Sequence, residues 1–203
     1  DFEMIYYNAD GLPGTMCGNG GRCAAAFAQE LGIVDKTAEF LACDGPHRAE
    51  IYKDRIKLSM ADVGQPERVG DDFFVDTGSP HYVIFTDRTD ELDVFSKGRE
   101  VRYNERFSKE GTNVNFVEAL PGKIRMRTYE RGVEDETLSC GTGVCAAAIC
   151  SSIRHPDEFA GRCDVQTRGG MLKVYFCVNG SGIFSDVWLE GPAVRVFSGI
   201  IKL

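Results

Sequence analysis

Most apolar segments of this chain are short and bounded by turn signals, a pattern that predicts strands. Two segments differ, because each is a continuous apolar helix that begins in a glycine-rich turn. Residues 18–31 contain only two charged side chains, Arg22 and Glu30, and residues 141–153 contain none. A helix that is apolar on every side is usually buried on every side. We therefore expect each helix to lie at the centre of its own domain, surrounded by strands.

The remaining segments predict strands and one further helix. The first strand, 2–8, ends in a turn that starts at Asn8, and the first helix ends near Leu31 with Gly32 as a cap. Residues 63–72 combine glycine, proline and charge, which favours a linker, and residues 91–103 predict an exposed helix. The other expected strands are 38–43, 48–52, 55–60, 73–77, 81–86, 113–119, 123–130, 164–168, 171–178, 184–189 and 193–201.

A cysteine comes directly before each apolar helix. The first motif is Met16-Cys17-Gly18-Asn19, and the second, 123 residues later, is Ser139-Cys140-Gly141-Thr142. The first N–H groups of a helix have no partner within the helix, and they favour negative charge. Such a position stabilises a thiolate and can also hold an anion such as a carboxylate.

The similarity of the two halves extends beyond the cysteines and indicates a tandem duplication. We predict an α+β fold of two pseudo-symmetric α/β domains, each a mixed sheet wrapped around a central buried helix, with the active site in the cleft between them. The first repeat covers 1–63 and the second 64–195, with a strand at 196–203 that packs back on the first. The second repeat begins well before the counterpart of Asp1, so we expect on the order of 50 further residues ahead of Asp1.

Composition excludes several classes of function. The chain has 203 residues and a net charge of −8 without basic runs, which argues against binding to nucleic acid or anionic membranes. No segment approaches the roughly 20 apolar residues of a membrane span. Eight cysteines without a Cys-x-x-Cys pair, and three scattered histidines, favour a reduced cytoplasmic protein with no zinc site. We expect neither a metal nor another cofactor.

Two cysteines at facing helix ends suggest a reaction. If the domains pack about a pseudo-twofold axis, Cys17 and Cys140 lie on opposite sides of whatever binds between them. One thiolate can remove a proton from a carbon beside a bound carboxylate, and the opposite thiol can return one on the other face. Electrostatic stabilisation in a dry cavity would then support the enolate-like state. This pattern predicts inversion at carbon without a cofactor.

The residues around these motifs resemble the diaminopimelate epimerase family, and the resemblance covers nearly the whole chain. The matching segments are Asn8-Ala9-Asp10-Gly11, Met16-Cys17-Gly18-Asn19-Gly20-Gly21-Arg22-Cys23, Gly78-Ser79-Pro80-His81, Asn113-Val114-Asn115-Phe116, Tyr129-Glu130-Arg131-Gly132 and Glu136-Thr137-Leu138-Ser139-Cys140-Gly141-Thr142-Gly143. The resemblance implies an isomerase that converts LL-2,6-diaminopimelate to the meso form, in lysine and peptidoglycan biosynthesis. Its partner would be a small amino-acid substrate, and a homodimer is left open.

The resemblance also implies roles for single residues. Cys17 and Cys140 would be the acid and base, with His81 in support. The residues that bind the reacting carboxylate of the substrate would be Gly18, Asn19, Gly141 and Thr142. Glu130 would bind the reacting ammonium group. The distal amino-acid end would be bound by Asn8, Ser79, Asn113 and Arg131. Two features depart from the family pattern: Ser79 stands where asparagine is usual, and the 130–140 loop is one residue longer.

Three alternatives remain at this point. A related racemase such as proline racemase also pairs two cysteines, although its first motif usually has histidine where Asn19 stands. A non-catalytic anion-binding module would use the glycine-rich helix starts, but neither turn has the Lys-Ser/Thr of a phosphate-binding loop. A thiol redox protein would cycle a bond between Cys17 and Cys140.

Overall fold

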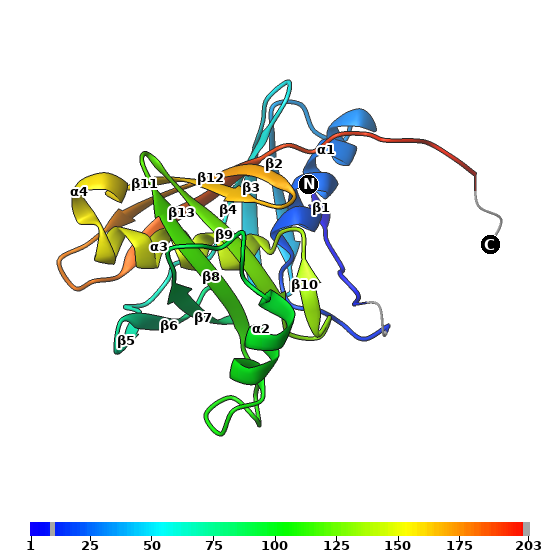
Figure 1. The fold of residues 1–203 in the computed structure, drawn as a ribbon. Coiled ribbons are helices and arrows are strands. Elements are labelled where there is room, and N and C mark those ends of the chain that lie inside the picture. Colours follow the sequence, from blue (N-terminus) through cyan, green and yellow to red (C-terminus); the bar gives the residue numbers. More distant parts are fainter. Residues whose placement is uncertain (9–10, 201–203) are drawn as a thin grey trace.

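The structure is a computed structural model that describes residues 1–8 and 11–200. Its elements alternate mainly between strands and short turns, with four helices among the described residues (Figure 1). The helices are α1 Gly18–Glu30, α2 Val94–Arg102, α3 Gly141–Arg154 and α4 Pro156–Phe159. The strands are β1 Phe2–Glu3, β2 Thr37–Ala42, β3 Gly45–Ile51, β4 Ile56–Ser59, β5 Glu67–Val69, β6 Asp72–Asp76, β7 Pro80–Phe85, β8 Asn113–Leu120, β9 Lys123–Glu130, β10 Asp135–Thr137, β11 Arg162–Thr167, β12 Gly170–Val178 and β13 Phe184–Gly191.

One strongly curved mixed sheet connects the two halves of the molecule. Its strand order is β1-β2-β3-β4-β13-β12-β11-β9-β8-β7-β6-β5, with β10 paired to β9 outside this path. The halves join where β13 pairs antiparallel with β4, and Leu189 lies opposite Leu58 there. The predicted α+β class is confirmed, whereas the domain limits 1–63 and 64–195 remain predictions.

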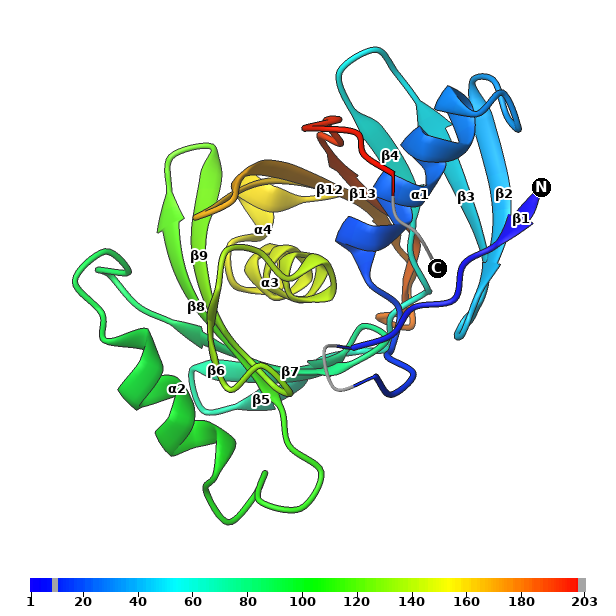
Figure 2. The same cartoon turned by 90° about the vertical axis from the view of Figure 1, so that its right-hand side faces the viewer.

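The helix α3 occupies the centre of the second half. Figure 2 shows α3 nearly end-on, with β6 to β9 curving around one side and β12 and β13 on the other. Every residue from Gly141 to Ser151 is buried. Small side chains such as Ala146, Ala147 and Ala148 allow strands to approach the helix from several directions. The sequence prediction of a helix buried on all sides is therefore correct for α3.

The same prediction is wrong for α1. Only one side of α1 is covered, by β3 and β4 of the first half (Figure 2). Its buried residues follow helical spacing along that side, whereas Phe27 on the opposite side is 58% exposed and Cys23 is exposed as well. The described strands of the first half form a flat layer rather than a surrounding wall, so an apolar helix composition did not guarantee burial.

Several predicted elements also differ in extent. The first strand is confined to Phe2–Glu3, because the chain then turns and Tyr7 forms a single bridge with Pro13. The expected linker at 63–72 contains β5, a short strand that pairs with β6. The helix expected at 91–103 is shorter and is not wholly exposed, since Val94 and Gly98 of α2 are buried against the sheet.

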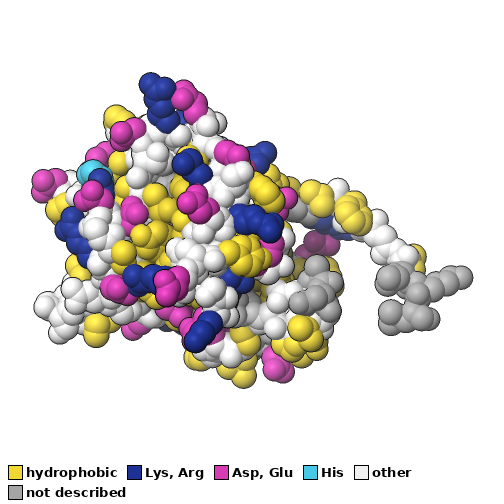
Figure 3. Space-filling model, turned by 60° about the horizontal axis from the view of Figure 1, so that its bottom comes forward, with side chains coloured by type: hydrophobic (Ala, Val, Ile, Leu, Met, Phe, Trp, Pro, Cys, Tyr) yellow, Lys and Arg dark blue, Asp and Glu magenta, His cyan; other side chains and the backbone are white. Residues whose placement is uncertain are grey.

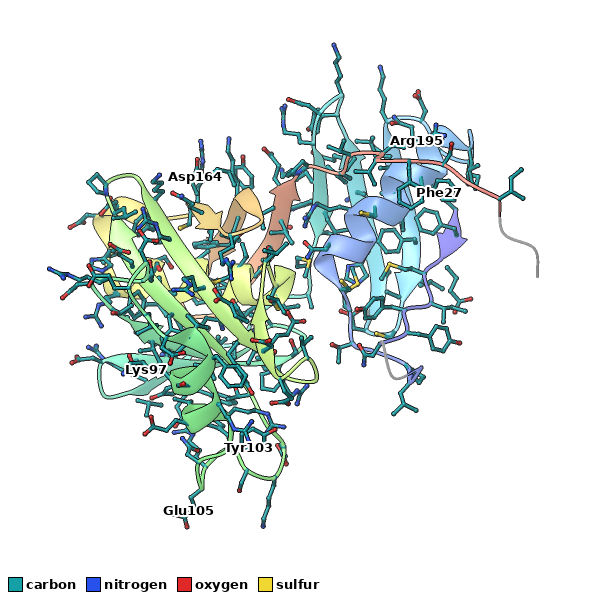
Figure 4. The ribbon with its side chains drawn as sticks, turned by 45° about the vertical axis from the view of Figure 1, so that its right-hand side comes forward. Phe27, Lys97, Tyr103, Glu105, Asp164 and Arg195 are labelled. Carbon is teal, nitrogen blue, oxygen red and sulfur yellow. The ribbon has the colours of Figure 1, made fainter. Side chains whose placement is uncertain are left out.

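The strand expected at 193–201 does not form in the described residues 193–200. This segment leaves the end of β13 and projects from the body of the molecule (Figures 1 and 3). Val196 and Phe197 are each 83% exposed, so 196–200 does not pack on the first half, and residues 201–203 lie outside the described chain. The ion pair from Arg195 to Glu30, at 2.7 Å, places the start of the segment beside α1 (Figure 4).

The packing of α2 against β9 gives a first prediction. A Cβ on Gly98 would lie 2.3 Å from the Cβ of buried Tyr129, closer than two such atoms can approach. We expect Gly98→Ala to lower the free energy of unfolding by about 1–3 kcal/mol, as overpacked sites do. This loss should exceed the gain of about 1 kcal/mol that alanine brings to a helix. Urea denaturation monitored by circular dichroism measures the change.

A matched control for this prediction is Gly64→Ala, because Gly64 is exposed and no atom lies within 4 Å of its added Cβ. Its urea midpoint should stay close to that of the unchanged protein. Equal midpoints for the Gly98 and Gly64 variants would show that α2 does not pack closely on Tyr129.

Candidate active site

The two cysteines stand in equivalent backbone positions. Cys17 is the N-cap of α1, with φ −107° and ψ 106°, and Cys140 is the N-cap of α3, with φ −111° and ψ 116°. The Cys17 sulfur accepts a hydrogen bond from the Gly20 N–H at 3.3 Å. Cys17 is half-buried, whereas Cys140 is only 9% exposed. Both sulfurs are thus presented at a helix N-terminus, as the motifs predicted.

The N-termini of α1 and α3 meet through two glycines. A Cβ built on Gly141 would lie 3.0 Å from the Cα of Gly18, and one built on Gly18 would lie 3.3 Å from the Cα of Gly141. Leu189 of β13 packs beneath both positions, 2.8 Å from the Cβ site on Gly18 and 3.1 Å from that on Gly141. A side chain at either position would push the helix ends apart. The glycines therefore permit the two cysteines to face a common space.

That space is a cavity of about 330 Å³. It is lined by both cysteines and by every residue that the sequence assigned to substrate binding. The lining residues are Tyr6, Asn8, Pro13, Gly14, Thr15, Met16, Cys17, Gly18, Asn19, Ser79, Asn113, Glu130, Arg131, Gly132, Ser139, Cys140, Gly141 and Thr142. His81 is the one predicted site residue that does not line it.

The loop before Cys140 is held by an ion pair. In the short hairpin of β9 and β10, Arg127 Nε and Nη2 each lie 2.7 Å from an oxygen of Glu136. Arg127 also donates from Nη1 to two backbone carbonyls of the segment before α2. A bidentate arginine–carboxylate pair fixes both distance and orientation. The start of the 130–140 loop, which the family resemblance suggested to be one residue longer than usual, therefore lies in a hydrogen-bonded hairpin.

The part of the cavity formed by Asn113, Glu130 and Arg131 carries polar groups, and some of their atoms already form hydrogen bonds within the protein. The amide of Asn113 donates to the Pro80 carbonyl at 3.0 Å and accepts from the Arg131 N–H at 2.9 Å. The Arg131 guanidinium donates from Nη1 to the Glu110 carbonyl at 2.8 Å, and the carboxylate of Glu130 accepts from the Thr137 hydroxyl. These bonds orient the side chains but leave donors and acceptors available to a ligand.

A buried arginine links the two halves of the site. Arg22 donates from Nη2 to the Asn19 side-chain oxygen at 2.8 Å, and the Asn19 amide nitrogen donates to the Ser139 carbonyl at 3.0 Å. The chain of bonds thus runs from α1 to the residue before Cys140. Burial lowers the pKa of the Arg22 guanidinium. The Asn19 side chain is thus engaged in bonds within the protein through both its oxygen and its nitrogen.

The surroundings of Cys140 favour its thiol form. Burial, followed by the negative charge of Glu130, raises the pKa of Cys140 to about 12. Hydrogen bonds from the Thr142 side chain and the Gly143 backbone oppose this shift. The same cavity raises the pKa of Tyr6, first through the charge of Cys17. Cys140 is therefore protonated near neutral pH, in the form that can donate a proton.

His81 lies behind the cavity wall rather than in it. Its Nε2 is 2.9 Å from the Thr142 hydroxyl and 3.1 Å from the Ser79 hydroxyl, and the Thr142 oxygen lies 3.4 Å from the Cys140 sulfur. Burial, and secondarily the charge of Arg131, lowers the pKa of His81 to about 3, so the ring is neutral. The expectation of a supporting position for His81 agrees with this geometry.

Sequence reasoning missed several residues of the site. Tyr6 and the segment 13–16 line the cavity because the chain turns back after β1, which a predicted strand over 2–8 did not anticipate. Asn115 of β8 and Thr128 of β9 belong to the hydrogen-bonded group that includes His81, behind Cys140. In the sequence, only the alternation within these two strands indicated that their side chains point inward.

Two features are absent from the described residues. Among residues 1–8 and 11–200, no three His, Cys, Asp or Glu side chains gather as metal ligands would. Across the same described residues, the structure contains no helix with the length and apolar character needed to cross a membrane.

Comparison with known proteins identifies relatives over the whole chain. The family model of diaminopimelate epimerase matches residues 73–196. The chain is 44% identical to the diaminopimelate epimerase of Flavobacterium psychrophilum, over 99% of this chain and 78% of that protein. It is 42% identical to the diaminopimelate epimerase of Chlorobaculum tepidum, over 100% of this chain and 81% of that protein.

Solved structures share the fold at low sequence identity. A probable proline racemase from Agrobacterium radiobacter superposes with a TM-score of 0.71 at 15% identity, covering 99% of this chain and 72% of that one. A phenazine biosynthesis protein of the PhzF family from Bacillus anthracis gives 0.73 at 14% identity, covering 98% and 80%. These likenesses show that the chain has a fold class that it shares with a probable proline racemase and a PhzF-family protein. Within that class the chain belongs to the diaminopimelate epimerase family, and it is an isomerase.

The raised pKa of Cys140 gives a second prediction. Alkylation by iodoacetamide requires the thiolate, so the rate at Cys140 should rise about tenfold per pH unit between about pH 7 and 9.5. An ordinary thiol would begin to level off near its pKa of about 8.5. Peptide mapping by mass spectrometry at each pH measures the rate, and exposed Cys43 verifies that the reagent is active. A plateau for Cys140 below pH 9 would contradict the raised pKa.

Proposed function

We propose that this protein inverts the α-carbon of LL-2,6-diaminopimelate to give the meso form, with Cys17 and Cys140 as the two proton-transfer groups. The single observation that carries the proposal is the contact between Gly18 and Gly141, which brings two cysteine-capped helix N-termini to one cavity. The names of the relatives support the substrate. The cavity supports the reaction type, because it offers a sulfur from each half.

The proton route follows from the two sulfurs. A thiolate on one side removes the α-proton, so that the C–H bond breaks and its electron pair remains on carbon. The thiol on the opposite side donates its proton to that carbon, and its sulfur keeps the S–H electron pair. The free site favours Cys140 as the acid, since the pKa of its thiol is raised. In the reverse direction the two sulfurs exchange roles.

The charges of the substrate match the cavity. A carboxylate beside the reacting carbon can accept hydrogen bonds from the N–H groups at the starts of α1 and α3, which have no partner within their helices. We assign the reacting ammonium group to Glu130, and the distal amino-acid end to Asn8, Ser79, Asn113 and Arg131. A substrate with two zwitterionic ends needs both donors and acceptors, and the lining residues include both.

The alternatives have less support. A related racemase would share the fold, but the identities of 44% and 42% are to diaminopimelate epimerases. An anion-binding module does not require two sulfurs at one cavity.

The face in Figure 3 mixes Lys and Arg with Asp and Glu, which supports the absence of a nucleic-acid partner. We place the protein in the cytoplasm, because all eight cysteines are free. A homodimer remains a prediction.

A third prediction tests the two-base mechanism. In heavy water, starting from one stereoisomer and sampled early, product should carry deuterium at the inverted carbon while recovered substrate stays largely protiated. The reason is that the proton-donating thiol has already exchanged with solvent, whereas the base holds the proton it removed. Mass spectrometry of the separated isomers measures the label.

Variants of the two cysteines complete the isotope test. Cys17→Ala and Cys140→Ala should each abolish inversion, because neither sulfur can reach the opposite face. Cys177→Ala is the control, since Cys177 is exposed and does not line the cavity. Early deuterium in recovered substrate at the level found in product would indicate a single base and would overturn the assignment.

The fourth prediction concerns recognition of the distal end. Arg131→Lys removes the planar fork that binds a carboxylate through two bonds. We expect a loss of about 1.5–3 kcal/mol in transition-state binding for each lost charged hydrogen bond, seen as a lower kcat/KM. The control is Arg88→Lys, because Arg88 is a surface residue paired with Glu91. Unchanged kinetics for Arg131→Lys would mean that its guanidinium does not contact substrate.

A further inference from the structure

A chain of buried hydrogen bonds extends from β9 to the Cys140 sulfur. The Thr128 hydroxyl lies 3.0 Å from the Asn115 side-chain oxygen, and the Asn115 amide nitrogen lies 3.0 Å from His81 Nδ1. His81 Nε2 lies 2.9 Å from the Thr142 hydroxyl, which reaches the Cys140 sulfur at 3.4 Å. All five side chains are at least nine-tenths buried.

The chemistry of each group fixes the direction of these bonds. The Asn115 amide nitrogen can only donate, so His81 Nδ1 must accept and the ring proton must be on Nε2. The Nε2–H then donates to the Thr142 oxygen. The Ser79 hydroxyl lies 3.1 Å from both His81 Nε2 and the Thr142 oxygen, and it can donate its own hydrogen to that oxygen. In this arrangement the Thr142 hydrogen donates to the sulfur, and each donor in the chain points toward Cys140. A thiolate accepts hydrogen bonds and cannot donate, so it suits the end of such a chain.

The opposite direction leaves a polar group unsatisfied. If the Asn115 amide were turned by 180°, its nitrogen would donate to Thr128, and the Thr128 hydrogen would need another acceptor. The described residues offer the Thr128 hydroxyl one hydrogen-bond partner, Asn115. A buried hydroxyl without an acceptor costs free energy. Gly143 lets the backbone of α3 lie close to this amide, because a Cβ there would lie 2.6 Å from the Asn115 oxygen.

We propose that Thr128 and Asn115 are positioning residues that hold His81 as the neutral Nε2–H tautomer and so direct the Thr142 hydroxyl to the Cys140 sulfur. This inference rests on the proposed role of Cys140 as a proton-transfer group. When Cys140 gives its proton to the substrate carbon, the S–H bond breaks and the sulfur keeps the electron pair. The Thr142 hydroxyl then stabilises the new thiolate. Neither Thr128 nor Asn115 lines the cavity, so they act only through His81 and Thr142.

The test reads the tautomer directly by NMR of protein labelled with ¹⁵N in its histidine rings. The chain has only three histidines, and the His81→Gln variant identifies the His81 signals by their loss. At neutral pH we expect the shift of a protonated nitrogen at Nε2 and of an unprotonated nitrogen at Nδ1. A proton found on Nδ1 in the unchanged protein would overturn the proposal.

Two variants probe the groups that hold the tautomer. Asn115→Asp replaces the amide donor by an acceptor, so the His81 proton should move to Nδ1. Thr128→Val removes the hydroxyl without changing shape, so the amide is free to turn and both tautomers should be seen. The matched control is Thr89→Val, another buried threonine that bonds a side chain, Glu118, away from the cavity. Retention of the Nε2–H form in both Asn115→Asp and Thr128→Val would show that the two residues do not hold it.

Kinetics separates a positioning role from a structural one. Thr128→Val should lower kcat about tenfold with little change in KM. A tenfold change in rate corresponds to about the free energy of one hydrogen bond. Thr89→Val should leave both constants unchanged, and circular dichroism verifies that each variant is folded. A changed tautomer with unchanged kcat would overturn the positioning role. If the unchanged protein did not epimerise diaminopimelate, the proposed function would fail, but the tautomer measurement would still decide whether Asn115 and Thr128 hold His81.

Discussion

The contact between Gly18 and Gly141 is the constraint on which the site depends. Two helix N-termini repel each other electrostatically, because each carries partial positive charge on its free N–H groups. Here they touch through glycine backbones above Leu189, where neither residue has a side chain to separate them. A bound carboxylate or a thiolate balances the combined positive field. The same contact that makes the pocket therefore also concentrates positive partial charge at it.

The two helices reach this contact from different environments. The strands of the second half surround α3, whereas α1 lies on a single layer and exposes Phe27 on its other side (Figure 4). Bonds across the junction compensate for this difference. Asn19 and Arg22 join the start of α1 to Ser139, and the pairing of β4 with β13 joins the sheets beneath. The position of Cys17 relative to Cys140 thus depends on contacts between the halves rather than on packing within the first half.

The buried side chains that lie behind Cys140 are mainly neutral. The interior behind Cys140 contains His81, Asn115 and Thr128, and the pKa of His81 is lowered so far that the ring does not compete for protons with a thiol. Glu130 is the acidic residue that opposes ionisation of Cys140. A thiol that resists ionisation is a poor resting base but a useful acid. In the proposed reaction, stabilisation of its thiolate is then needed only while the substrate carbon holds the proton.

The sequence by itself determined the two apolar helices, their cysteine caps and most strands, because periodicity and glycine-rich turns are local properties. Eleven of the eighteen cavity residues could be named from the motifs and the family resemblance. Only the tertiary structure decided that α1 is exposed on one side, that residues 193–200 form no strand, and that Tyr6 and Asn115 belong to the site. Burial and hydrogen bonding join residues distant along the chain, and no local pattern records which partner strand, if any, will cover a given face.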